Sequence, residues 1–400
     1  MAVVCAIAAA LMATPMALAQ FDVLYTFGGT PDGASPYGSL VTDAKGNVYG
    51  TTSGGGTLGF GSVYSGTLSG KEKTIYTFAG GNDGAYPYGA LLRDAKGNLY
   101  GTTSAGGGAS GCFGSGCGTV FKIDVHGKET VLYRFKGGTD GGLPYSGLTM
   151  GMKGYFYGTA SVGGNLSCGA PMGCGVVYGI NLSGNQVILH TFNGGSDGAY
   201  PLYGSLAVDA QFNVYGTTQK GGDGSCNPPN GCGTVFKLSK TNKLSIRWRF
   251  KGGKDGSFPA AGVLLFNNKL YGTTPVGGTF DNGTVYDATL GGPLVKDTLW
   301  MYGKHKNDGA TPLGGVTIDP LGNLYVPTEA GGTLGYGALS RIDTTGKESV
   351  VHNFNFSDEG GVPVAQTTYD AVCACLVGTT LEGGTTQNGP GSGTVWKWKR

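Results

Sequence analysis

Charged residues are scarce in this chain of 400 residues: Asp, Glu, Lys and Arg together make up 13% of it, against roughly 25% in an average soluble domain. The formal net charge is +2, and Lys and Arg are spread along the chain without forming a cluster. Nucleic-acid binding requires positive charge concentrated on one face. We therefore expect no nucleic-acid partner.

Recognisable catalytic and metal-binding motifs are also missing. The chain has four His, and it contains no HExxH motif, no GxSxG nucleophile elbow and no EF-hand loop. Its glycine runs include GxGxxG-like matches, but none follows a strand and opens a helix, as a phosphate-binding loop would. The sequence therefore nominates no catalytic residue and no cofactor.

Only one long apolar segment is present. Residues 1–19 are uncharged and end in Ala17-Leu18-Ala19, which is typical of a signal peptide with a small-residue cleavage site. A membrane helix is the alternative, but spanning takes about 20 apolar residues, and Pro15 interrupts this run. We expect an exported protein, secreted or periplasmic, whose mature chain (residues 20–400) has no membrane span.

Cysteine usage agrees with export. Cys5 lies in the signal segment, and the other eight cysteines form close pairs. Disulfides are typical of exported proteins, and these pairs lack the nearby His of a zinc site. The predicted bridges are Cys112–Cys117, Cys168–Cys174 and Cys226–Cys232. Cys373 and Cys375 are only two residues apart, so a tight bridge and two free thiols are both open there.

Glycine, in contrast, is abundant, with 80 residues, and it belongs to a repeat. An acidic-Gly-x-x-Pro element recurs every 51 to 58 residues, followed each time by YGTT or a variant of it. The acids of this element are Asp32, Asp83, Asp140, Asp197, Asp255, Asp308 and Glu359. Seven copies of one unit indicate a repeat architecture.

Each repeat contains four strand candidates. In the second repeat they are GALLRD, NLYGTT, GTVFKID and ETVLYRF, in which β-branched and aromatic residues alternate with polar ones. Turn sequences such as DAKGN and VHGK separate them. We predict an all-β chain that folds as one seven-bladed β-propeller domain (residues 20–400), with four antiparallel strands per blade.

The two ends of the chain predict how the ring closes. FDVLYTF at residues 21–27 matches the fourth strand of a repeat, and GTVWKWK near the C-terminus matches the third. The N-terminal strand should therefore pair with the C-terminal strand and complete the last blade, which removes an open edge. Fourth strands also carry aromatic residues two positions apart, such as Tyr76 and Phe78, which we expect to pack between blades.

The repeats resemble a known family. DGAYPYGALLRDAKGNLYGTT, the glycine run after it and GTVFKID are similar to the GloVer-type tandem repeat of exported bacterial "choice-of-anchor" proteins. The resemblance covers residues 21–399 and implies an exported, propeller-like protein, and the family has no established activity to transfer. Its members carry varied C-terminal anchors, whereas this chain ends in WKWKR, so we expect a free periplasmic or secreted protein.

The seven repeated acids are the main candidate site, because they could form a ring that binds Ca²⁺ or a carbohydrate. Asp followed by Gly is, however, ordinary turn chemistry, and a catalytic site would single out one or two repeats. We expect a structural role for these acids, with a Ca²⁺ site as the alternative. The Thr pairs that end the second strands, such as Thr102 and Thr103, are a further candidate, because they could line a polar mouth.

These observations favour a monomeric binding or scaffold protein that is not an enzyme. The glycine-rich loops should share one face with the acid-containing links, and loops on a rigid scaffold are common binding sites. The expected partner is an extracellular glycan or protein. Two alternatives stay open: a hydrolase or lyase that acts on a polysaccharide with carboxylates from different blades, or a structural protein without a specific ligand.

Overall fold

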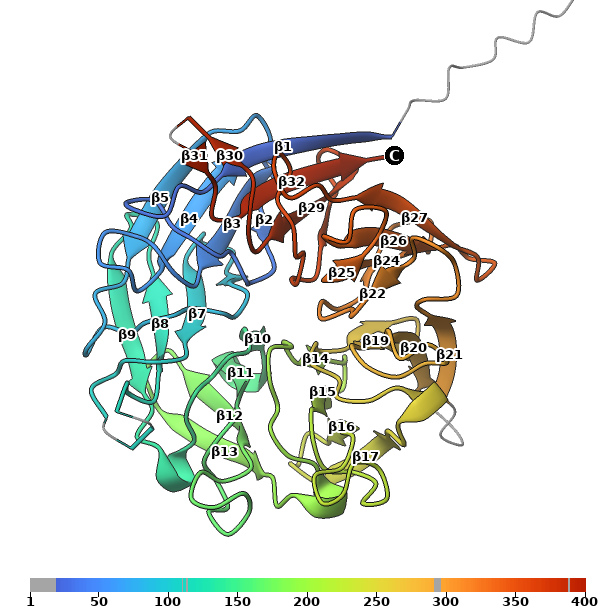
Figure 1. Ribbon diagram of the computed structural model, residues 1–400. Coiled ribbons are helices and arrows are strands. Elements are labelled where there is room, and N and C mark those ends of the chain that lie inside the picture. The colour runs from blue at the N-terminus through green and yellow to red at the C-terminus, as the bar shows by residue number, and fades with distance from the viewer. Residues whose placement is uncertain (1–18, 110, 113, 291–295, 388) are drawn as a thin grey trace, which may run out of the picture.

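The computed structural model describes residues 19–109, 111–112, 114–290, 296–387 and 389–400. Seven four-stranded antiparallel sheets stand around a central axis as the blades of a propeller (Figure 1). No α-helix occurs among these residues. The predicted fold class is therefore confirmed, while the predicted signal peptide, residues 1–19, lies outside the described residues except for Ala19.

The blades follow the chain, and in each of blades 1 to 6 the strands run in order from the axis outward (Figure 1). Blade 1 contains β2 (Val41–Thr42), β3 (Asn47–Thr52), β4 (Ser62–Thr67) and β5 (Glu72–Thr77). Blade 2 contains β6 (Leu92–Arg93), β7 (Leu99–Thr103), β8 (Thr119–Ile123) and β9 (Glu129–Arg134). Blade 3 contains β10 (Thr149–Met150), β11 (Tyr155–Ala160), β12 (Val176–Asn181) and β13 (Gln186–Thr191). Blade 4 contains β14 (Ala207–Val208), β15 (Val214–Thr218), β16 (Thr234–Leu238) and β17 (Leu244–Arg249).

The remaining blades complete the ring. Blade 5 contains β18 (Leu264–Phe266), β19 (Lys269–Thr274), β20 (Thr284–Thr289) and β21 (Lys296–Met301). Blade 6 contains β23 (Thr317–Ile318), β24 (Leu324–Thr328), β26 (Ala338–Ile342) and β27 (Glu348–Asn353). Blade 7 contains β28 (Thr368–Asp370), β29 (Cys375–Thr380), β32 (Thr394–Lys399) and β1 (Gln20–Thr26).

Short elements lie in the connections. Two small pairs are β22 (Gly309–Ala310) with β25 (Ala330–Gly331), and β30 (Thr385–Thr386) with β31 (Gly389–Pro390). Single 3₁₀ turns are η1 (Gly138–Asp140), η2 (Met152–Gly154), η3 (Gly195–Asp197) and η4 (Gly253–Asp255). No helix in the described part of the chain is long and apolar enough to cross a membrane.

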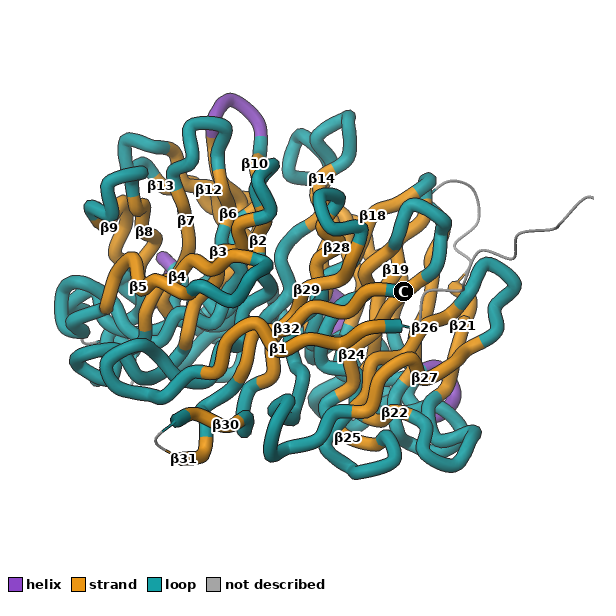
Figure 2. The backbone as a smooth tube through the Cα atoms, turned by 90° about the horizontal axis from the view of Figure 1, so that it is seen from above, coloured by secondary structure: helices purple, strands orange, loops and turns teal. Residues whose placement is uncertain are grey.

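The ring closes as predicted, by pairing its two ends. β1 runs antiparallel to β32 from Gln20 opposite Lys399 to Thr26 opposite Thr394, and the two strands lie side by side (Figure 2). The ring of Phe21 stacks on His352 of blade 6 at 3.7 Å between centroids. The N-terminal strand therefore fills the outer position of blade 7 and also contacts blade 6.

Aromatic side chains pack the blades against one another. The second aromatic residue of each fourth-strand pair is fully buried, and Phe78 of blade 1, for example, meets Phe121 of blade 2 at 5.1 Å. Phe121 in turn covers Gly101 on the neighbouring strand, where a Cβ would lie only 2.5 Å from the ring. Blade 6 has a larger residue at the glycine position and a smaller one at the aromatic position, because Val326 there pairs with Ser340.

Two faces of the ring result from this topology. The links from each fourth strand to the next first strand share one face with the loops between second and third strands, and we call this the link face. The hairpins between first and second strands and between third and fourth strands form the opposite side, the turn face. Each first strand therefore runs from the link face toward the turn face.

Candidate functional site

The seven repeated acids do not form a ring around the axis. Each accepts hydrogen bonds within its own link, as Asp83 does from the Tyr76 hydroxyl at 2.8 Å and from the backbone N–H of Ala79 at 2.6 Å. In the same way, six of the acids are hydrogen-bonded to an aromatic side chain (Tyr, His or Trp) of the preceding fourth strand. The pairs are Tyr25–Asp32, Tyr76–Asp83, Tyr133–Asp140, His190–Asp197, Trp248–Asp255 and His352–Glu359. Because fourth strands are outermost, the acids lie at the periphery of the ring.

The next blade adds a third side chain to several of these acids. Glu129, the first residue of β9, lies close enough to Asp83 to interact with it electrostatically, and burial together with Asp83 raises the pKa of Glu129 to about 7. Glu72 beside Asp32 and Glu348 beside Asp308 follow the same pattern, also with pKa values of about 7.

Two blades use a different side chain at this third position. Gln186 donates to the carbonyl of Asp140 at 3.0 Å and accepts from the Tyr133 hydroxyl at 3.0 Å. The Lys296 ammonium lies 2.9 Å from Asp255, and only 1% of its side chain is exposed. The acids thus belong to seams between blades. No group of three or more His, Cys, Asp or Glu side chains that could hold a metal ion occurs within the described residues.

The three predicted disulfides are present, and the pair Cys373 and Cys375, for which the sequence allows either a bridge or free thiols, is bridged as well. The bonds are Cys112–Cys117, Cys168–Cys174, Cys226–Cys232 and Cys373–Cys375. The first three close glycine-rich loops on the link face.

The threonine pairs, in contrast, do not line a mouth. Thr102 donates to the carbonyl of Ser146 in the next blade at 2.7 Å, and Thr103 hydrogen-bonds to Thr119 at 2.8 Å. Both side chains are buried, so the hypothesis of a polar mouth is wrong for this pair.

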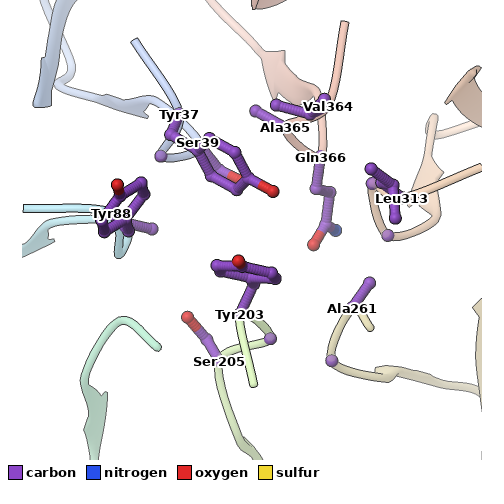
Figure 3. A pocket seen from close by; sticks show the side chains of 16 residues that line it. Tyr37, Ser39, Tyr88, Tyr203, Ser205, Ala261, Leu313, Val364, Ala365 and Gln366 are labelled. Carbon is purple, nitrogen blue, oxygen red and sulfur yellow. The ribbon is translucent and has the colours of Figure 1, made fainter. Parts of the chain in front are cut away.

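A cavity lies instead on the propeller axis, and one of the positions that surround it differs between the repeats. One position, one or two residues after the link proline, holds a tyrosine in blades 1 to 4 and an aliphatic residue in blades 5 to 7. These residues are Tyr37, Tyr88, Tyr145, Tyr203, Ala260, Leu313 and Val364. The cavity has a volume of about 50 Å³, and Tyr37, Tyr88 and Tyr203 line it together with Leu313 and Val364. Figure 3 shows Tyr37, Tyr88, Tyr203 and Gln366 around the same space.

The tyrosines pack as a connected cluster. Ring centroids are 4.9 Å apart for Tyr37 and Tyr203, which come from blades 1 and 4, and 5.3 Å apart for Tyr37 and Tyr88. Tyr145 packs behind them, 5.5 Å from Tyr88 and 5.4 Å from Tyr203. All four rings keep partial exposure. The axis is thus closed by tyrosines on one side and by small or aliphatic side chains on the other.

The link geometry sets the tyrosines at the link-face end of the axis. The residue before each link proline has a left-handed backbone, with φ between +53° and +60° at Ser35, Tyr86, Leu143, Tyr200, Phe258, Thr311 and Val362. Such a conformation is unfavourable for non-glycine residues and needs support. The Tyr86 backbone supplies an example, since its N–H donates to Phe60 and its carbonyl accepts from Ser104. The chain then turns into the first strand and directs Tyr88 to the axis.

Polar groups in the cavity are uncharged. Its described lining includes Ser39, Ser205 and Gln366, and no charged residue. The Gln366 amide is fixed by donation to the carbonyl of Val316 at 2.7 Å. Burial raises the pKa of Tyr88, Tyr145 and Tyr203, so these hydroxyls stay protonated and can both donate and accept. The surface combines aromatic rings, hydroxyls and an amide.

One carboxylate lies close to this cluster. Glu329 follows β24 and contributes, after burial and Tyr203, to the raised pKa of Tyr37. The pKa of Glu329 itself is raised by burial and by Glu382 of blade 7. Neither acid belongs to the repeated set.

Sequence reasoning missed this site because it compared what the repeats share. The signal was present in the sequences PYG, PYG, PYS and PLYG of blades 1 to 4 against PAAG, PLGG and PVAQ of blades 5 to 7. A tyrosine that is present in four repeats and absent from the next three marks one side of a ring.

A family model described as the Gloeobacter/Verrucomicrobia repeat matches residues 10–172 and 167–392. None of the curated proteins matches the chain.

Solved structures with similar architecture include the extracellular domain of the one-component system BT4673 from B. thetaiotaomicron (12% identity, TM-score 0.57, covering 94% of this chain and 39% of that chain). The extracellular domain of the hybrid two-component system BT3049 from the same organism is also similar (12%, 0.53, 94% and 40%). The gluconolactonase XC5397 from Xanthomonas campestris is a more distant match (13%, 0.43, 76% and 82%). At these identities the likeness concerns the fold alone.

Proposed function

This chain belongs to the Gloeobacter/Verrucomicrobia repeat family, and we propose that it is an exported β-propeller that binds the end of a glycan chain at the axial tyrosine cluster. The observation that carries the proposal is the one-sided set of tyrosines on the axis, in a ring whose other repeated aromatic residues pack blade against blade. Aromatic rings beside hydroxyls and an amide suit a sugar ring, which stacks through its C–H face and hydrogen-bonds through its hydroxyls.

The size and neutrality of the cavity restrict the kind of ligand that it can bind. A volume of about 50 Å³ is far below the roughly 300–1,000 Å³ of pockets that enclose a whole small molecule. A sugar ring would therefore stack on the exposed parts of the tyrosines, with one hydroxyl or hydroxymethyl group entering the cavity. Because Tyr37 and Tyr203 meet across the axis, a chain cannot thread through, which favours a chain end. The neighbouring Glu329 disfavours acidic sugars.

Titration calorimetry with neutral oligosaccharides (cellohexaose, maltohexaose, xylohexaose and mannohexaose) tests the proposal. We expect at least one to bind, and Tyr203→Ala to weaken its affinity about fivefold to tenfold, as loss of one aromatic contact implies. Tyr86→Ala is the matched control, because Tyr86 lies on the same face away from the cavity and is 37% exposed. Equal loss in both variants, or no binding by any of the four sugars, would contradict the proposal.

A polysaccharide hydrolase is the second candidate, and Glu329 is the observation that favours it. A half-buried carboxyl whose pKa is raised beside a second carboxylate, here Glu382, has the property required of a general acid. Release of reducing ends from the same oligosaccharides by the wild-type protein, lost in Glu329→Gln, would support this function. Binding without release would favour the non-enzymatic protein.

The four disulfides support a secreted or periplasmic location, because such bonds persist in oxidising compartments. Within this proposal the protein acts as a monomer without a cofactor, and its partner is an extracellular glycan rather than a nucleic acid. Sedimentation of the mature protein measures its oligomeric state.

A further inference from the structure

The hairpin at the start of blade 7 differs from its siblings in how it closes. In four other blades an Asp at the end of the first strand accepts from the Asn that precedes or starts the second strand, as Asp94 does from the Asn98 amide at 2.7 Å. The sibling pairs are Asp43–Asn47, Asp94–Asn98, Asp209–Asn213 and Asp319–Asn323. In blade 7 Cys375 stands opposite Asp370, and the bond Cys373–Cys375 closes the turn. Since the siblings close without a disulfide, the fold does not require one here.

The backbone of this turn is also less favourable than that of the other bridged loops. In those loops the residue before the second cysteine is a glycine with positive φ: Gly116, Gly173 and Gly231. In blade 7 the same position is Ala374, with φ of +50°. A left-handed conformation is less favourable for alanine than for glycine, because the alanine Cβ lies too close to the backbone. The ring is also the smallest of the four, with a sequence separation of two against five, six and six.

The two sulfur-bearing residues differ in exposure. The bridge lies on the turn face beside two exposed residues, Val372 (56% exposed) and Ala374. Cys373 is partly exposed, whereas Cys375 is buried with 2% exposure. Asp370 accepts the backbone N–H groups of Val372 and Cys373 at 2.9 and 3.0 Å, which fixes the turn. A thiol that approaches from solvent therefore meets the sulfur of Cys373 first.

We propose that Cys373–Cys375 is a thiol–disulfide exchange site whose substrates are cysteine thiols of other exported polypeptides. A substrate thiolate attacks Sγ of Cys373, the Cys373–Cys375 bond breaks, and Cys375 leaves as a thiolate that takes a proton from water. A second substrate thiol then attacks the mixed disulfide and releases Cys373. The substrate loses two electrons and gains a disulfide, and this protein is left with two thiols. The reverse sequence with an oxidised substrate or glutathione disulfide restores the bridge.

The position of the exchange equilibrium is the first test. The mature protein is equilibrated in glutathione redox buffers, alkylated at low pH and digested, and each cysteine pair is quantified by mass spectrometry. We expect Cys373–Cys375 to be half reduced at a value of [GSH]²/[GSSG] at least about tenfold lower than for the three loop disulfides. Ala374→Gly should move its midpoint about fivefold toward theirs, because it removes the unfavourable φ. Reduction of all four pairs together would overturn the proposal.

The assignment of Cys373 as the attacked sulfur has its own test. Cys375→Ser leaves Cys373 free, and we expect it to form a mixed disulfide with glutathione disulfide rapidly. Cys373→Ser leaves only the buried Cys375, which should react at least about tenfold more slowly. Equal rates for the two variants would contradict this assignment.

Exchange with a protein substrate completes the test, with reduced, unfolded ribonuclease A in a glutathione redox buffer as the probe, because its cysteine thiols are the proposed substrates. The wild-type protein should accelerate recovery of ribonuclease activity, and the double variant Cys373→Ser/Cys375→Ser should not. Cys112→Ser/Cys117→Ser is the matched control and should keep the acceleration, with circular dichroism confirming that both variants are folded. Acceleration retained in the first double variant would overturn the proposal.

Discussion

At the scale of single residues, the packing of six of the seven blades depends on one glycine in the second strand. Gly101 makes room for the Phe121 ring, which also receives Phe78 from the previous blade. The methyl groups of a valine at position 101 would overlap the phenyl ring of Phe121. We expect Gly101→Val to lower the free energy of unfolding by about 3 kcal/mol, at the upper end of overpacking costs, as measured by urea denaturation.

Blade 6 supplies the control for this prediction, because it carries Val326 opposite Ser340. The double variant Gly101→Val/Phe121→Ser copies that pair. We expect it to be more stable than the sum of the two single effects predicts, by about 1 kcal/mol or more. If the effects of the two single substitutions simply add, the two positions are not coupled through the space that their side chains share.

Glu129 gives a pH-dependent prediction at the same scale. Its pKa is about 7 in the folded chain, against a usual value of 4.5, because of burial and Asp83. Folding therefore favours the protonated form, so the stabilising contribution is complete below pH 4.5 and is lost as the pH rises through 7. Glu129→Gln should raise the free energy of unfolding at pH 8 by about 1 kcal/mol, a value reduced for partial exposure. It should have little effect at pH 4.

The reverse substitution in blade 3 is the matched control. Gln186 occupies the equivalent position and hydrogen-bonds to both Asp140 and Tyr133. Gln186→Glu should introduce the same loss of stability between pH 4.5 and 7 that Glu129→Gln removes. If the free energy of unfolding depends on pH in the same way in wild type and both variants, the glutamates at these two positions do not titrate between pH 4.5 and 7.

At the scale of strands and links, local sequence pattern was enough to predict most of the architecture. Alternation and turn chemistry located the four strands of each blade, and the match of FDVLYTF to a fourth strand predicted the pairing of β1 with β32. The third members of the seams, such as Glu129, could not be found in this way, because they reach the acid only when two blades stand side by side. The axial tyrosines were missed for the same reason, since only ring closure brings Tyr37 and Tyr203 together.

The strand β1 is the element on which closure depends. It covers β32, where the Trp396 and Trp398 side chains are at most 4% exposed, and it carries the buried Phe27 next to its end. Deletion of residues 21–27 should expose this edge. We expect a lower thermal midpoint and a red shift of tryptophan fluorescence, measured against the protein that starts at Gln20. An unchanged midpoint would show that the ring closes without the N-terminal strand.

At the scale of the whole molecule, the ring separates two kinds of residue. The seven repeated acids lie in seams at the periphery, while the tyrosines that only blades 1 to 4 carry lie on the axis, and the cysteine pair that only blade 7 has in its first hairpin lies on the turn face. Chemistry directed at one ligand needs one site, so we place it where the repeats differ. The four axial tyrosines occupy adjacent blades, which makes one side of the axis unlike the other.

This division leads to a prediction about calcium. Ca²⁺ requires six to eight oxygen ligands close together, whereas each repeated acid binds donors of its own seam, as Asp83 does with Tyr76 and Ala79. We therefore expect millimolar Ca²⁺ or EDTA to move the thermal midpoint by less than about 1 °C. Asp83→Asn should lower the midpoint by the same amount with and without Ca²⁺, because it weakens a hydrogen-bonded seam. Stabilisation of the wild type by Ca²⁺ that disappears in Asp83→Asn would instead show that a seam recruits further oxygen ligands and holds the ion at the periphery of the ring.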